Sequence, residues 1–87
     1  MIDKKIEKLG YKKIEENKYG VIFRWEDPGL NRKREVAILH KATTDNIIQV
    51  YDPDHMFGKY TAMDALTMTE MKLFLKKFKQ MVKKYRW

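Results

Sequence analysis

Hydrophobic positions in the first ten residues follow the spacing of a helix. Ile2, Ile6 and Leu9 fall at i, i+4 and i+7 with charged residues between them, and Gly10 follows where helices commonly end in a left-handed residue. The pattern predicts a short helix from Met1 to Leu9. Because so short a helix is not stable alone in water, we expect it to dock on a larger surface.

Four runs rich in β-branched and aromatic residues follow, with turn-forming residues between them. The predicted strands are Tyr11–Glu15, Tyr19–Trp25, Glu35–Lys41 and Asn46–Tyr51. The first and last pairs predict hairpins, and the residues Asp-Pro-Gly at 27–29 favour a type II turn between the hairpins. The order predicts an antiparallel meander. The segment 52–60 contains proline, glycine and two aspartates, which indicates an irregular connection.

The C-terminal segment has the pattern of a long amphipathic helix. Thr67, or else Thr69, is a candidate N-cap, and Glu70 complements the positive end of the helix. At about 100° per residue, the apolar side chains share one sector. This predicted apolar stripe contains Met71, Phe74, Leu75, Phe78, Met81, Val82 and Tyr85. The predicted opposite side contains Lys72, Lys76, Lys77, Lys79, Lys83, Lys84 and Arg86.

These elements predict a single α+β domain over residues 1–87, in the order α-β-β-β-β-α, with both helices packed on one face of a four-stranded sheet. Strand alternation assigns the packed face to Val21, Phe23, Trp25, Val36, Ile38, Ile48 and Val50. It assigns the open face to Ile22, Arg24, Leu39, Lys41, Gln49 and Tyr51. Because a solvated antiparallel face is usually more polar than this one, the open face is a candidate interaction surface.

Composition restricts the class of protein. The chain has 87 residues, 44% of them hydrophobic, which is enough for one small core and too apolar for an intrinsically disordered chain. It contains no cysteine, which argues against a secreted disulfide scaffold and excludes a thiolate metal site. The N-terminus has no hydrophobic stretch like that of a signal peptide, and no segment is long enough to span a membrane. We therefore expect a cytoplasmic protein with no membrane partner.

The positive charge is concentrated at one end. Residues 67–87 contain seven basic side chains and one acid, giving +6 of the formal net charge of +7. Such a one-ended field favours an anionic partner, and DNA or RNA is the leading hypothesis. The candidate contacts are Lys72, Lys76, Lys79, Lys83 and Arg86 on the helix, with Arg24 and Lys41 on the sheet.

Three alternatives stay open. The lysines can be no more than the solvated side of a packed helix, since lysine is both a helix former and a solubiliser. The segment can bind a membrane surface or a calmodulin-like partner if its apolar residues, Leu73 and Trp87 among them, are exposed. The protein can instead be an interaction module, dimerising through Ile22, Leu39 and Tyr51 or inhibiting an acidic protein.

Residues with catalytic potential are sparse. Asp52, Asp54 and His55, with Asp45 or His40, suggest a metal-dependent phosphodiesterase, but their spacing matches no metal motif, and aspartate beside proline is ordinary turn chemistry. The second basic cluster, residues 32–34, is flanked by acids and is expected in a solvated loop, with insertion into a nucleic-acid groove as the alternative. We expect no enzyme, no cofactor and no metal.

The chain resembles two groups of proteins, the first over most of its length and the second over its whole length. The α-β-β-β-α order of elements and the basic final helix resemble the double-stranded RNA-binding domain. That family has a lysine cluster at the start of its last helix, where this chain has Thr67-Met-Thr-Glu70, and the fourth strand is extra. The segments LGYKKIEENKYGVIFRW and ALTMTEMKLFLKKFKQMVKKYRW together resemble small uncharacterised proteins of phages and prophages of Gram-positive bacteria. That resemblance implies an accessory protein of a mobile element, acting in the host cytoplasm, and carries no activity to particular residues.

Overall fold

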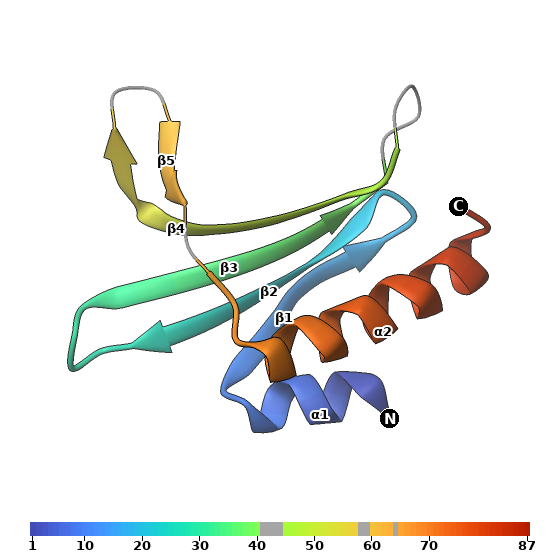
Figure 1. The fold of residues 1–87 in the computed structure, drawn as a ribbon, viewed down its shortest axis with the longest axis horizontal. Helices are drawn as coiled ribbons and strands as arrows, with labels where there is room; N and C mark the ends of the chain where they lie inside the picture. The colour runs from blue at the N-terminus through green and yellow to red at the C-terminus, as the bar shows by residue number, and fades with distance from the viewer. Residues whose placement is uncertain (41–44, 58–59, 64) are drawn as a thin grey trace.

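The computed structural model describes residues 1–40, 45–57, 60–63 and 65–87, with the backbone alone for 55–57 and 60–63. Its elements are α1 (Ile2–Lys8), β1 (Tyr11–Asn17), β2 (Gly20–Asp27), β3 (Arg32–Leu39), β4 (Ile47–Phe57), β5 (Tyr60–Met63) and α2 (Met68–Tyr85). The strands pair antiparallel in chain order, and both helices lie on one side of the sheet (Figure 1). The α+β class and the predicted meander between two helices are confirmed, and a short fifth strand extends the meander.

The fifth strand corrects the expectation for segment 52–60. β4 continues through Asp52 to Phe57 and then pairs with β5, where an irregular connection was expected. The prediction ended the strand at Tyr51 because proline, glycine and two aspartates follow it. Proline is tolerated here because the ladder between β4 and β5 is interrupted between Asp52 and Met56, so its missing N–H breaks no regular pair.

The turn between β2 and β3 also differs from the prediction. The Asp27 carboxylate accepts hydrogen bonds from the backbone N–H groups of Gly29 and Leu30, at 3.0 and 3.3 Å. The left-handed residue of the turn is Asn31, with φ 50°, and not Gly29 as a type II turn requires. The strands consequently extend further than expected, and the basic cluster 32–34 belongs to β3 instead of a loop.

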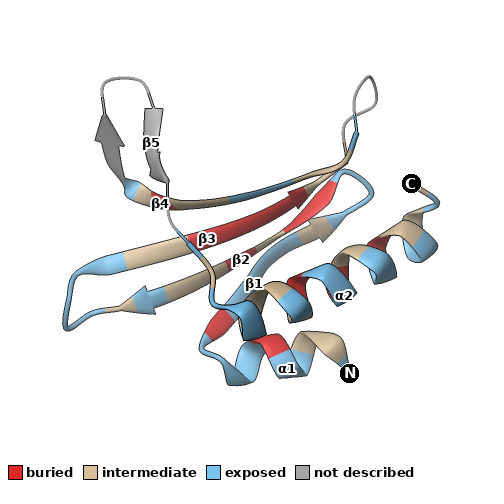
Figure 2. Cartoon of the chain, viewed as in Figure 1, coloured by how far each residue is buried: buried red, intermediate tan, exposed pale blue. Residues whose placement is uncertain are grey.

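The core lies between the sheet and the helices (Figure 2). Its fully buried residues come from α1, the first three strands and α2, and are Ile6, Tyr11, Val21, Phe23, Val36, Ile38, Phe74 and Met81. Trp25 and Val50 pack against this cluster, as the assignment of the packed face predicted. Ile48 is the exception on that face, because 39% of it is exposed.

The junction between α1 and β1 depends on a glycine. Gly10 has φ +100°, the left-handed conformation predicted for the end of the helix. A Cβ at this position would lie 2.9 Å from Cδ1 of Trp25, so the ring also requires glycine here. This tight turn brings α1 back beside α2, and Ile6 completes the core.

Candidate nucleic-acid interface

The outer surface of α2 carries a row of exposed lysines. Lys72, Lys76, Lys79 and Lys83 recur at i, i+4, i+7 and i+11, which places them on one side of the helix. With a rise of about 1.5 Å per residue, the row is about 16 Å long. We call these four residues the lysine ridge. Arg86 is exposed just beyond the helix, in a left-handed conformation.

No residue of the lysine ridge forms an ion pair with any carboxylate in the part of the chain that the structure describes. Many other described cations are paired, and these pairs include Lys13–Asp3, Arg24–Glu35, Lys33–Asp54, Arg34–Glu70, Lys77–Glu16 and Lys84–Glu16. Acids of α1, of the strands and of α2 thus compensate cations on the strands and two lysines of α2, the buried Lys77 and the exposed Lys84. The charge of the ridge points to solvent.

Lys77 does not lie on the solvated side of α2, as the sequence pattern predicted. It is 1% exposed, and its Nζ lies 2.6 Å from Glu16 Oε1, 2.7 Å from Gln80 Oε1 and 2.9 Å from Asp3 Oδ1. Leu75, predicted in the apolar stripe, is instead 47% exposed. Compared with the predicted apolar stripe, the buried side of α2 is rotated toward Lys77. Burial of this lysine is possible because Asp3 on α1 and Glu16 on β1 compensate its charge.

A β-bulge in β1 creates that acidic cluster. The pairing with β2 shifts between Lys13 and Glu15, so Glu16 faces Val21 on the helix side of the sheet. Regular alternation from the buried Tyr11 would have turned Glu16 to the other face. Burial alone would raise the pKa of Glu16, but hydrogen bonds from Lys77, Lys84 and Tyr85 outweigh it and hold the pKa well below its usual range.

Both ends of α2 are also fastened. At its start Thr67 and Glu70 form the predicted capping box, with Thr67 Oγ1 accepting from the Glu70 N–H at 3.1 Å and Glu70 Oε1 accepting from the Thr67 N–H at 2.8 Å. The Tyr11 hydroxyl donates to Glu70 Oε2 at 2.7 Å, and burial of the phenol raises the pKa of Tyr11 to about 12.

Beyond the end of α2, Trp87 Nε1 donates to the Lys18 carbonyl at 2.9 Å, and the indole stacks on His40. Trp87 and Leu73 both pack against the core, whereas the membrane-surface alternative needed them exposed. No described helix is long and apolar enough to cross a membrane. Contacts at the start, middle and end of α2 hold the helix in place. The fold therefore sets the direction in which the lysine ridge points.

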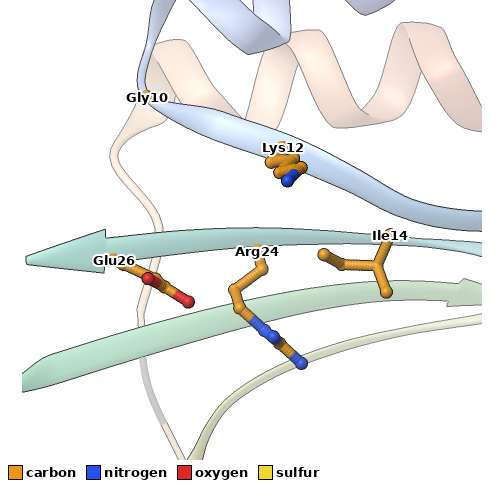
Figure 3. Close-up of a pocket in the computed structure, with 5 residues that line it drawn as sticks. All are labelled: Gly10, Lys12, Ile14, Arg24 and Glu26. Atoms are coloured by element: carbon orange, nitrogen blue, oxygen red, sulfur yellow. The ribbon is translucent and has the colours of Figure 1, made fainter.

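The two predicted contacts on the sheet differ from those on the helix. Lys41 lies outside the described residues. Arg24 is on the open face, where its Nε and one terminal nitrogen donate to Glu35 Oε2 at 3.0 and 2.8 Å. Arg24 also lines a hollow of about 270 Å³ with Gly10, Lys12, Ile14 and Glu26 (Figure 3). Because Glu35 and Glu26 offset its charge, Arg24 is a weaker candidate for binding phosphate than the ridge.

The predicted protein interface is divided between two places on the open face. Ile22 and Leu39 line a hollow of about 190 Å³ beside Tyr19. Tyr51 lies apart from it and donates its hydroxyl to Glu35 Oε1 at 3.2 Å, in the network of Arg24. Burial, and then the Glu35 carboxylate, raise the pKa of Tyr51. The three residues thus do not form one continuous patch.

The acidic residues of β4 serve local structure. Asp52 is buried and accepts from the Asp54 N–H at 3.0 Å, and Asp54 pairs with Lys33 at 3.1 Å. The His55 side chain lies outside what the structure describes. Among described residues, no three histidine, aspartate or glutamate side chains are grouped as metal ligands.

Comparison of the chain with family models, with curated proteins and with solved structures finds no match in any of the three.

Proposed function

We propose that this protein is a non-enzymatic module that binds DNA or RNA through the lysine ridge, with little sequence preference. The observation that carries the proposal is the row of four exposed lysines on one side of α2, without a described carboxylate partner. Arg86 extends the row toward the C-terminus.

Counterion release and the fixed position of α2 both support the proposal. Lysines that neutralise phosphates release condensed counterions, which gives affinity without reading the bases. A ridge on a helix fastened at three points loses less conformational entropy on binding than a flexible basic tail, although each lysine must still order its side chain. The resemblance to small phage proteins favours an accessory role of this kind.

The experiment is a titration of duplex and single-stranded DNA and RNA at increasing salt. We expect micromolar binding at low salt, and four phosphate contacts predict a slope of log K against log salt of about −3 to −4 on duplex DNA. The variant Lys72→Gln/Lys76→Gln/Lys79→Gln/Lys83→Gln should lose most of that slope and at least tenfold in affinity.

A variant with the same net charge provides the control. Lys4→Gln/Lys5→Gln/Lys8→Gln/Lys12→Gln removes four exposed lysines from α1 and β1 and leaves the ridge intact. It should retain most of the affinity and slope of the native protein. Equal losses of affinity in the two variants would mean that binding depends on net charge and not on the lysine ridge. Absence of binding at low salt would refute the proposal.

A further inference from the structure

An apolar groove runs between α2 and β4 on the helix-bearing side of the sheet. Ile48 is 39% exposed, although its neighbour across the strand pair, Ile38, is 1% exposed in the core. The facing wall is Leu75, which the rotation of α2 toward Lys77 leaves exposed. Figure 1 shows α2 running beside α1, with β1 and β2 between it and β4 in this view.

The groove consists of two neighbouring hollows. The first, about 140 Å³, is lined by Ile38, Asn46, Ile47, Ile48, Leu75 and Phe78. The second, about 480 Å³, is lined by Asn46, Phe78, Lys79, Val82, Lys83 and Trp87. Asn46 and Phe78 line both, so the hollows are adjacent. From Leu75 to Lys83 they follow α2 for roughly 12 Å, or about two helical turns. Trp87 folds back over this stretch, with its ring centroid 6.3 Å from that of Phe78.

The chemistry of the lining is asymmetric. The floor and walls are mainly aliphatic and aromatic, whereas Lys79 and Lys83 stand along the α2 rim. Neither hollow is lined by an acidic residue among those described, and Asn46 is the neutral polar group of the opposite wall. A ligand that fills the groove must therefore be apolar on one side and negatively charged beside Lys79 and Lys83.

We propose that this groove binds an acidic amphipathic helix of a partner protein, with apolar side chains against Ile48, Leu75 and Phe78 and carboxylates beside Lys79 and Lys83. A helix presenting apolar residues at i, i+3, i+4 and i+7 matches a groove of this length. A second copy of the chain is a poor occupant, because its net charge of +7 would place lysines against lysines. Nucleic acid would pair with the rim and leave the apolar floor uncovered.

The test uses a synthetic helical peptide of about 16 residues, with leucines at the above spacing and glutamates beside them. The protein's two tryptophans provide a built-in comparison in NMR spectra, because Trp87 lines the groove and Trp25 does not. We expect the indole N–H signal of Trp87 to shift on titration while that of Trp25 stays, with a dissociation constant of about 100 µM or tighter. A peptide with glutamine in place of glutamate should bind at least fivefold more weakly at low salt.

Two neutral substitutions matched in exposure separate the groove from the rest of the surface. Leu75→Gln should weaken peptide binding about tenfold and leave DNA binding unchanged. Ile14→Gln, at 44% exposure on the other face of the sheet, should change neither. Lys79→Gln/Lys83→Gln gives a second measure and should weaken the glutamate peptide more than the glutamine peptide.

Several results would overturn the proposal. One is peptide binding that Leu75→Gln does not weaken, and another is equal binding of the glutamate and glutamine peptides. A third is a concentration-dependent dimer, seen by light scattering, that Leu75→Gln dissociates. Binding of anionic lipid vesicles with Trp87 shifted, together with no binding of the peptide, would assign the groove to a membrane surface. Loss of DNA binding in the ridge variant with peptide binding unaffected by Leu75→Gln would leave the proposed function standing and refute the groove.

Discussion

The inner and outer sides of α2 use the same residue type for opposite purposes. Lys77 is enclosed by Glu16, Asp3 and Gln80, and its charge is compensated within the fold. The lysine ridge lies about 100° to 160° from Lys77 around the helix axis. It has no described ion pair, and its charge is exposed to solvent. A lysine's role here depends on which acids the fold brings near it, so the count of basic residues overstates the charge available to a partner.

The comparison also explains why the groove exists. Compensation of Lys77 by α1 and β1 draws that side of α2 toward the N-terminal edge of the sheet, and Leu75 is left facing β4 without full cover. A helix packed by its most apolar sector would have buried Leu75 and exposed Lys77, as the sequence pattern predicted. The buried ion cluster therefore sets the rotation of α2, and with it the position of both candidate surfaces.

The largest expected effect comes from replacing one lysine on each side of α2 by methionine. The two variants test whether the buried and the exposed lysine differ in their contribution to stability. Lys77→Met keeps the length of the side chain but leaves Glu16 and Asp3 with fewer partners, which should lower the free energy of unfolding by about 3 kcal/mol. Lys79→Met, on the ridge, should change it by about 0.5 kcal/mol or less. Urea denaturation measures both. If the two variants are equally stable, the buried cluster does not orient α2.

The pH dependence of stability tests the acid side of the buried cluster. Because the pKa of Glu16 is held below its usual range when the protein is folded, this group contributes stability above its ordinary pKa of about 4.5 and loses it as the pH falls toward the folded value. The unfolded chain then binds one more proton at this site, which corresponds to about 1.4 kcal/mol per pH unit.

Denaturation of native protein and Glu16→Gln at several pH values measures that contribution. The variant should be less stable near neutral pH and should lose less stability on acidification below about pH 4.5. Glu7→Gln, which changes an exposed carboxylate of α1, should follow the native profile in parallel. A Glu16→Gln profile parallel to that of the native protein would contradict the assignment.

Periodicity and turn chemistry were sufficient to predict most of the fold. The predicted helices, the four-stranded meander and the capping box at Thr67 are local patterns, and the structure confirms them. The fifth strand was missed because Pro53 signals a break, and only the interrupted ladder shows that the break is tolerated. The turn at residues 27–31 was misassigned because the Asp27 carboxylate competes for the backbone N–H groups there.

The candidate site was predictable only in part. The ridge follows from helical spacing, and all five predicted helix cations are exposed. The burial of Lys77 depends on Glu16, and Glu16 faces the helices because of a bulge that no local pattern indicates. One signal was present, since Lys77 lies three residues after Phe74 and four before Met81, on the side where both are buried. The periodic pattern grouped Lys77 with the other lysines because it sorts residues by polarity. It contains no information on which carboxylates the fold brings near them.

A substitution within the lysine ridge should have the smallest effect on the free energy of unfolding, and the effect should be a gain instead of a loss. Lys76 has Lys72 four residues before it and Lys79 three residues after it, so like charges repel along the row. Lys76→Glu should replace that repulsion with attraction and raise the free energy of unfolding by about 0.5 to 1 kcal/mol at low salt. Lys76→Gln removes the repulsion alone and should give about half the gain. Because exposed charges are screened, both gains should vanish near 1 M salt, where the Debye length is about 3 Å. A gain that persists in high salt would point to helix propensity or packing, whereas a salt-sensitive gain means that the native ridge keeps its charge at a cost in stability, as expected of a surface retained for a partner.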